Sequence, residues 1–122
     1  MLSVIHNEDK TFINCKALSA KLHRPAFYII KYFGYMLKGN INMTQSYIEG
    51  YYEKSVLDKV LNRFVYDYVY CPDCKLNNSV LVVRDERVCT KCINCQNIWY
   101  CDNKFNKYIL KYRNYNLSKK RG

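Results

Sequence analysis

The spacing of apolar residues predicts one long amphipathic helix near the middle of the chain, over residues 53–67. At 3.6 residues per turn, the apolar and polar side chains of this segment fall on opposite faces. The apolar face consists of Leu57, Val60, Leu61, Phe64 and Tyr68. The polar face consists of Asp58, Lys59, Asn62 and Arg63. This is the clearest element that the hydrophobic pattern predicts.

Two shorter helices are predicted ahead of it, one on each side of Arg24-Pro25. The first covers residues 16–23, with Asn14 as its candidate N-cap. Its inward face consists of Ala17, Leu18 and Leu22. Because proline disfavours the helical conformation of the residue before it, the first helix should end at Arg24. The second helix has Pro25 in its first turn and stops at Gly39-Asn40. Its apolar stripe consists of Ile29, Tyr32, Phe33, Met36 and Leu37.

Short strands are predicted where apolar residues alternate or cluster without helical spacing. These segments are residues 10–15, 41–50 (as two strands around Thr44-Gln45), 67–71, 79–83 and 87–91. The last two should be joined by a turn at Asp85-Glu86.

Six of the seven cysteines lie within residues 70–101, in Cys-x-x-Cys pairs. Two thiolates separated by two residues can reach the same tetrahedral zinc ion. Taking Cys71 with Cys74 and Cys92 with Cys95 leaves seventeen residues between the pairs, which is typical of a zinc ribbon. The sequence therefore predicts one structural Zn²⁺ bound by these four residues. A four-thiolate site is coordinatively closed and leaves no position for water or substrate.

Cys89 is an alternative ligand, because Cys89 and Cys92 also form a Cys-x-x-Cys pair. That choice leaves fourteen residues between the pairs, slightly fewer than a ribbon usually has. Cys89 also lies within a predicted strand, whereas the residues around Cys95 have a loop-like composition. Cys15 and Cys101 are expected to be small buried residues. The odd number of cysteines, and an N-terminus without the pattern of a secretion signal, indicate metal binding in a reducing compartment.

These elements predict an α+β fold, in which a small α/β module packs against a C-terminal four-cysteine zinc ribbon followed by a basic tail. The expected boundaries are residues 1–69 for the module, 70–101 for the ribbon and 102–122 for the tail. Almost no linker separates module and ribbon, so we expect them to pack as one unit.

The formal net charge of +10 favours an anionic partner such as RNA or the ribosome. Residues 102–122 carry most of the excess, with seven Lys and Arg against one acidic residue, and aromatic rings alternate with the cations. Such a pattern can hold phosphates and stack on bases. The candidate contacts are Arg84 and Arg87 at the ribbon turn and, in the tail, Lys104, Lys107, Tyr108, Lys111, Tyr112, Arg113, Lys119, Lys120 and Arg121. The alternatives are an ordinary polar turn, and a solvated tail whose Tyr108, Ile109 and Leu110 pack on the ribbon.

Other classes of function lack a sequence signal. The longest apolar run, "AFYII", is far shorter than the ~20 residues that cross a membrane. There is no Ser/His/Asp set, no glycine-rich phosphate loop and no carboxylate pair with a reason to be catalytic. We expect neither an enzyme nor a small-molecule substrate.

Three stretches resemble the domain shared by eukaryotic translation initiation factor 5, at its N-terminus, and the beta subunit of initiation factor 2. "ALSAKLHRPAFYIIKYFGYMLKG" resembles the helix, Arg-Pro and Lys-Tyr-Phe-Gly segment of that family, and "YIEGYYEKSVLDKVLNRFVYDYVYCPDC" its strand, glycine, long helix and first knuckle. "KFNKYILKY" resembles the segment that follows the ribbon in factor 5. The resemblance covers residues 10–112.

The resemblance implies a cytoplasmic role in translation initiation. The implied partners are the small ribosomal subunit, initiator tRNA or the initiation factor 2 complex, with contacts to RNA. Factor 5 also activates GTP hydrolysis through an arginine in an arm ahead of this domain. Residues 1–9 contain no arginine, and Arg24 belongs to the helix break. The lysine-rich blocks of the beta subunit and the C-terminal helical domain of factor 5 have no counterpart here either, so we expect a minimal factor.

Two other functions stay open at this point. Zinc ribbons also occur in RNA polymerase subunits and their associated factors, so the chain could be a transcription-related adaptor. A GTPase-activating protein is the third possibility, and its only candidate arginine near the N-terminus is Arg24.

Overall fold

The computed structural model describes residues 1–112, apart from the side chain of Tyr112. The chain divides into two compact units, Met1–Tyr66 and Asp67–Gly122, which we call the N-terminal unit and the C-terminal unit. The boundary falls two residues before the end of the long helix α3, Lys54–Tyr68. No helix among the described residues is long and apolar enough to span a membrane.

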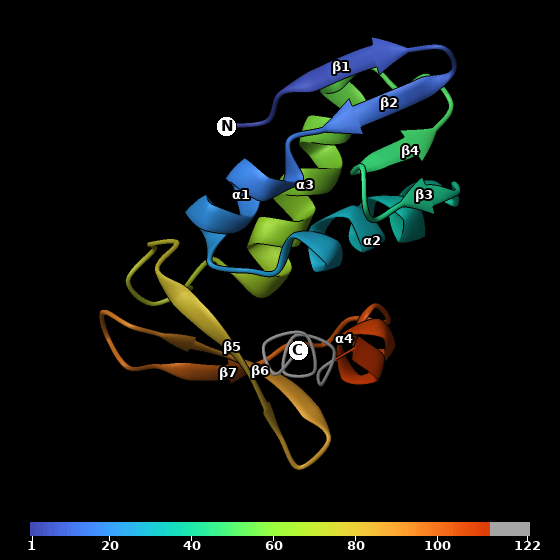
Figure 1. The fold of residues 1–122 in the computed structure, drawn as a ribbon. Coiled ribbons are helices and arrows are strands. Elements are labelled where there is room, and N and C mark those ends of the chain that lie inside the picture. The colour runs from blue at the N-terminus through green and yellow to red at the C-terminus, as the bar shows by residue number, and fades with distance from the viewer. Residues whose placement is uncertain (113–122) are drawn as a thin grey trace. The chain divides into compact units, whose positions relative to one another are not determined.

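The N-terminal unit contains a four-stranded antiparallel sheet (Figure 1). Its strands are β1 (Val4–Asn7), β2 (Lys10–Ile13), β3 (Ile41–Asn42) and β4 (Tyr47–Glu49), in the order β1-β2-β4-β3. Thr11 and Ile48 are direct partners across β2 and β4, and both are fully buried. Their neighbours Phe12 and Tyr47, on the opposite face, are only half-buried. One face of the sheet is therefore the core face.

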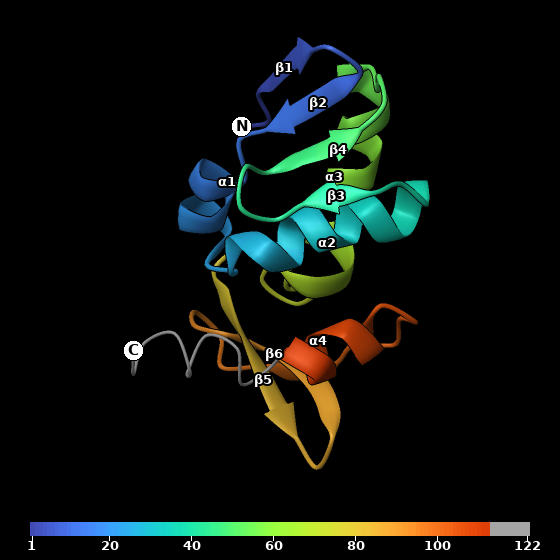
Figure 2. The same cartoon turned by 45° about the vertical axis from the view of Figure 1, so that its right-hand side comes forward.

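Three helices complete the N-terminal unit: α1 (Cys15–Leu22), α2 (Ala26–Leu37) and α3. Helix α3 runs behind the sheet in both ribbon views, and α2 runs beside β3 (Figures 1 and 2). The largest fully buried apolar residues of these elements are Leu18, Leu22, Ile29, Ile30, Tyr32, Phe33, Ile48, Leu57 and Phe64. The ring of Tyr32 meets the ring of Phe64 edge to face at 5.1 Å between centroids. The predicted apolar stripe of α3 is confirmed, because all of its members are buried.

Some details of the helical predictions are wrong. Ala17 is exposed, and Cys15 takes its place on the inward face of α1. Met36 is exposed because α2 ends one residue later, where Lys38 adopts a left-handed conformation. Pro25 is the N-cap of α2 and lies just before its first turn.

The predicted capping of α1 and the predicted strand over residues 67–71 are also wrong in part or whole. Asn14 occupies the N-cap position, but its side chain accepts from the N–H of Ser3 and donates to the carbonyl of Met1. It therefore fastens the N-terminus and does not cap the helix. Residues 67–71 form no strand, because α3 continues to Tyr68 and the chain then turns.

The C-terminal unit contains a three-stranded antiparallel sheet in the order β5-β6-β7. The strands are β5 (Ser79–Arg84), β6 (Arg87–Cys92) and β7 (Ile98–Tyr100). Asp85 and Glu86 form the predicted turn, and both have positive φ, 51° and 61°. Two left-handed residues are what a two-residue type I′ hairpin turn requires. The twisted β5–β6 hairpin is seen side-on in Figure 2.

Helix α4 (Asn106–Tyr112) packs on β6 and completes this unit. Phe105 and Ile109 are the buried residues of this segment. The ring of Phe105 lies 6.0 Å from that of Tyr68, centroid to centroid. The Tyr68 hydroxyl donates to Asn106 Oδ1 (2.7 Å), and Asn103 Nδ2 donates to Asp67 Oδ2 (2.7 Å). The first part of the predicted tail is thus an ordered helix joined to the end of α3.

Gly34 allows α2 and β3 to approach closely. A Cβ added at Gly34 would lie 2.7 Å from Cγ2 of Ile41, closer than real Cβ atoms come to a neighbour. Replacement by alanine should lower the free energy of unfolding by about 1–2 kcal/mol, because overpacking outweighs the better helix propensity of alanine. The measurement is urea unfolding of the metal-loaded protein, followed by circular dichroism. The double variant Gly34→Ala with Ile41→Ala removes the clashing methyl and should recover part of the loss relative to Ile41→Ala alone. Gly34→Ala with unchanged or raised stability would contradict the close approach.

Candidate metal centre

Two turns of the C-terminal unit carry the candidate metal ligands. Cys71 and Cys74 lie in the turn between α3 and β5, while Cys92 is the last residue of β6 and Cys95 lies in the turn that follows. The hairpin of β5 and β6 returns the chain to its starting point, since Ser79 pairs with Cys92. The two turns therefore meet at the same end of the ribbon.

The two turns have the same backbone geometry. In each, the N–H of the first cysteine donates to the carbonyl five residues later, and the residue four positions later donates back to the cysteine carbonyl. The bonds are Cys71 N to Leu76 O (3.0 Å) and Lys75 N to Cys71 O (2.9 Å) in the first turn, and Cys92 N to Asn97 O (2.9 Å) and Gln96 N to Cys92 O (3.1 Å) in the second. Lys75 and Gln96 both have positive φ, 60° and 63°. The ribbon thus contains two equivalent cysteine knuckles.

The four sulfur atoms of Cys71, Cys74, Cys92 and Cys95 all lie within 4.8 Å of one another. The Sγ atoms of Cys71 and Cys95 are 3.6 Å apart, and those of Cys74 and Cys92 are 3.3 Å apart. In a tetrahedral zinc site with Zn–S bonds of about 2.3 Å, sulfur atoms are about 3.8 Å apart. The cluster therefore has the size and the ligand chemistry to hold one tetrahedral ion such as Zn²⁺.

Proton affinities in the cluster show why a cation would suit it. The contact with the Cys92 thiol, aided by burial, raises the pKa of Cys74 to about 12. The backbone N–H of Cys95, with further hydrogen bonds, lowers the pKa of Cys92 to about 7. Without a cation, one thiolate is thus favoured at the expense of its neighbour. A divalent metal removes this conflict, because coordinated thiols lose their protons.

The other cysteines lie elsewhere. Cys89 is fully buried in β6, and its thiol faces the carbonyl of Arg87 at 3.8 Å. It is not among the residues that form the four-sulfur cluster. Cys15 is buried in α1, where burial raises the pKa of its thiol to about 12. Cys101 is only half-buried, and its sulfur lies 3.1 Å from Oγ1 of Thr90.

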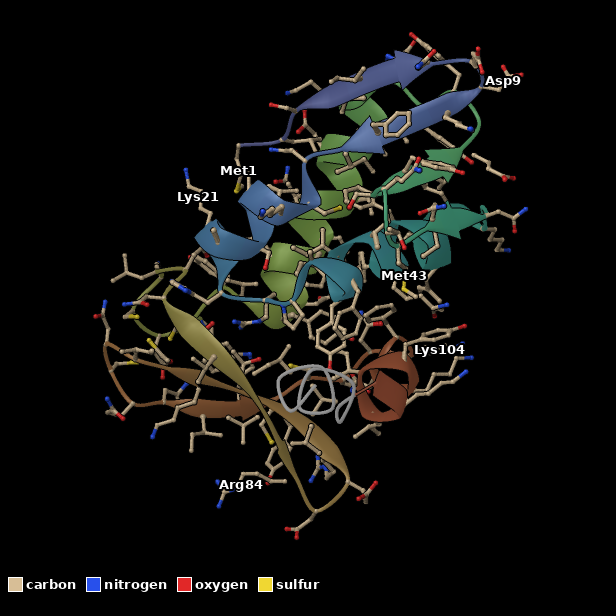
Figure 3. All side chains as sticks on the ribbon, viewed as in Figure 1. Met1, Asp9, Lys21, Met43, Arg84 and Lys104 are labelled. Carbon is tan, nitrogen blue, oxygen red and sulfur yellow. The ribbon has the colours of Figure 1, made fainter. Side chains whose placement is uncertain are left out.

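The basic residues predicted as nucleic-acid contacts lie in two places within the described chain. Arg84 and Arg87 are exposed on either side of the ribbon turn, and Figure 3 shows Arg84 extending away from the sheet. The guanidinium carbon of Arg87 lies 3.8 Å from the centre of the Tyr100 ring, so these two side chains stack. Sequence analysis missed Tyr100, although β7 places it two strands away from Val82 in the same row.

The second group lies on and beside α4. Lys104 and Lys107 are exposed, and Lys104 is labelled in Figure 3. The Lys107 ammonium lies 5.2 Å from the centre of the half-buried Tyr108 ring, and Lys111 follows one turn later. The side chain of Tyr112 and the residues Arg113, Lys119, Lys120 and Arg121 lie outside the described part of the chain.

Comparison with known proteins identifies the family. Residues 2–98 match the family whose description is a domain found in initiation factors 2B and 5. Eukaryotic translation initiation factor 5 of Saccharomyces cerevisiae is 29% identical over 106 residues, which cover 81% of this chain and 26% of that protein. The beta subunit of translation initiation factor 2 from Methanopyrus kandleri is 32% identical over 92 residues, which cover 72% of this chain and 67% of that protein. Factor 5 of Caenorhabditis elegans is 32% identical over 94 residues, 73% of this chain and 22% of that protein.

The chain therefore belongs to the family of domains found in translation initiation factor 5 and the beta subunit of factor 2, as the sequence resemblance indicated. It is a translation initiation factor-like protein of mixed α and β structure with a clustered four-cysteine site. It spans about a quarter of the length of the factor 5 relatives that it matches.

The ligand set can be tested with two matched substitutions. Cys95→Ala should abolish stoichiometric metal binding, because three thiolates leave the fourth coordination position open, whereas Cys89→Ala should leave it unchanged. The measurement is zinc content after gel filtration, expected at about one ion per chain in the parent, with the cobalt(II) spectrum as a second readout of four-sulfur coordination. Loss of the four-sulfur spectrum in Cys89→Ala but not in Cys95→Ala would show that Cys89 is the fourth ligand.

Proposed function

We propose that this protein is a minimal translation initiation factor whose zinc-stabilised C-terminal unit binds the ribosome, RNA or the initiation factor 2 complex. The observation that carries the proposal is the family match over residues 2–98, which includes both the α/β module and the cysteine cluster. The printed names of the relatives associate that domain with translation initiation.

The proposed metal has a structural role. Cys71, Cys74, Cys92 and Cys95 would supply all four ligands of a tetrahedral ion, so no coordination position remains for a substrate or a reacting water. The ion would join the turn before β5 to the turn after β6 and so close the ribbon. The protein would then act by binding and not by catalysis.

The proposed RNA-binding surface consists of Lys104, Lys107, Tyr108 and Lys111. Lys107 and Lys111 are one turn apart on α4, with the Tyr108 ring beside the Lys107 ammonium. Phe105 and Ile109 bury the adjacent side of the segment, which gives this surface a fixed support. Lysines combined with an aromatic ring on a fixed support can bind phosphates and contact bases.

Activation of GTP hydrolysis is not part of this proposal. The side chain of Arg24 is buried, with 1% of the residue exposed. Its Nη1 donates to the carbonyls of Leu22 (3.2 Å) and His23 (3.0 Å), so it satisfies backbone groups at the end of α1. A guanidinium in this position supports the fold and is not presented to a partner.

The polymerase-adaptor alternative rests on the ribbon alone. The family match extends over the α/β module as well, and the relatives reported above are translation factors. No observation on this chain favours the alternative specifically.

The proposal can be tested by co-sedimentation of the full chain with purified small ribosomal subunits at several salt concentrations. The double variant Lys104→Glu with Lys107→Glu should bind about tenfold more weakly or worse, with a shallower dependence on salt, because two cations that displace counterions are reversed. The matched control is Lys16→Glu with Lys21→Glu, which makes the same change of charge on the exposed side of α1 and should bind nearly as the parent does.

Equal loss in both variants would show that only the total charge matters. No binding of the parent chain to small subunits, to the factor 2 complex or to RNA at moderate salt would overturn the proposed function.

A further inference from the structure

Strand β5 forms an open edge of the ribbon. It pairs with β6 along its full length, from Ser79 opposite Cys92 to Arg84 opposite Arg87. Within residues 1–112 no strand pairs with its other side, since the sheet order is β5-β6-β7. An unpaired strand edge presents backbone donors and acceptors that another extended chain can use.

The hairpin geometry shows which backbone groups point outward. In a two-residue hairpin the residues that flank the turn, Arg84 and Arg87, form a hydrogen-bonded pair. Bonding to β6 then alternates along β5, so the N–H and C=O groups of Leu81 and Val83 point away from β6. The β7 side of β6 shows the same alternation, because the Val88 carbonyl accepts from Cys101 N at 2.9 Å. Outside the strand ladders of the described chain, no backbone hydrogen bond involves Leu81 or Val83.

The side chains of this edge carry few of the features that prevent strand pairing. Such edges are usually protected by proline, bulges, inward charges or short length. Strand β5 has six residues, continuous register with β6 and four consecutive apolar residues from Val80 to Val83. These four side chains are half-buried. The only charge on the strand is Arg84 at its end.

The charge around the edge indicates what it would accept. Cross-strand partners share a face of the sheet, so Arg84, Arg87 and Lys91 lie on one face, together with Val80 and Val82. Leu81 and Val83 lie on the other face. The acidic residues of this hairpin, Asp85 and Glu86, are confined to its turn. A strand added to β5 would therefore place alternate side chains next to cations on one face and next to apolar groups on the other.

We propose that β5 is a strand-addition site for an extended peptide segment of a partner protein, in which acidic and apolar residues alternate. Its acidic side chains would lie on the face of Arg84, and its apolar side chains would lie beside Leu81 and Val83. Main-chain hydrogen bonds to Leu81 and Val83 would provide much of the affinity, as in other cases of strand addition. A second copy of this chain is a poorer occupant, because each copy carries a net charge of +10. RNA would leave the aliphatic side chains and the backbone groups unused.

The test uses the full zinc-loaded chain and an acetylated heptapeptide that alternates Glu with Val. Binding is measured by fluorescence anisotropy, and amide hydrogen exchange is measured residue by residue with and without the peptide. The peptide should saturate and should slow exchange at Leu81 and Val83 more than at Val80 and Val82, which already bond to β6. The same peptide with Gln in place of Glu should bind about tenfold more weakly, because it lacks the attraction to the arginine and lysine face.

Two pairs of variants separate the edge from general effects. Val83→Pro removes an outward N–H without removing a ladder bond and should weaken binding about tenfold, whereas Val83→Thr keeps the N–H and should stay within about twofold. Arg84→Glu should weaken binding far more than Lys21→Glu on α1, which makes the same change of charge. The hydrogen exchange of the parent chain decides the question even if Val83→Pro fails to fold.

Three outcomes would overturn the proposal. The first is binding without protection of Leu81 and Val83, or no binding. The second is concentration-dependent self-association that protects these amides without the peptide, which would identify a second copy as the occupant. The third is a single-stranded RNA oligonucleotide that protects the edge better than the peptide does. None of these outcomes depends on ribosome binding, so failure here leaves the proposed function to its own test.

Discussion

The close approach of four sulfur atoms is the constraint on which the C-terminal unit depends. Cys71 and Cys74 precede β5, and Cys92 and Cys95 lie at and after the end of β6, yet all four sulfurs lie within 4.8 Å of one another. Thiols at this distance are compatible with one another only when they share protons or a cation. A metal would therefore fix the two knuckles, and with them the ends of β5 and β6. The ribbon between them has a small core of its own, which is why small domains of this kind use metals as staples.

The N-terminal unit is stabilised in a different way. Its buried residues come from three helices and from one face of a four-stranded sheet, and they form an apolar core with edge-to-face aromatic contacts such as Tyr32 with Phe64. Gly34 and the buried Arg24 fit this core through backbone effects. Gly34 leaves room for Ile41, and Arg24 satisfies carbonyls at the end of α1. The Arg-Pro and Lys-Tyr-Phe-Gly features, which carry the family resemblance, thus have a structural explanation in this chain.

Much of this structure could be predicted from patterns with a direct physical cause. The stripe of Leu57, Val60, Leu61 and Phe64 predicts α3 because burial of one face selects the helical period, and the spacing of the cysteine pairs predicts their convergence. The failures have causes too. Residues 67–71 are rich in tyrosine and valine and resemble a strand, but Tyr68 continues the stripe of Phe64 at the i+4 position and keeps the helix going. Helix α4 was hidden by its lysines, although Phe105 and Ile109 show helical spacing. The left-handed backbone of Lys75 and Gln96 has no sequence signal, because neither is glycine or asparagine.

Removal of the metal with a chelator, followed by residue-resolved nuclear magnetic resonance, is the most direct test of the central claim that the four thiols hold an ion on which the C-terminal unit depends. The backbone amide signals of residues 67–112 should lose their dispersion when the metal is removed and regain it when zinc is restored. The signals of the sheet and of α1 and α2 in the N-terminal unit should keep theirs, because an apolar core supports those elements. Dispersed signals from β5, β6 and β7 in the metal-free protein would contradict the claim.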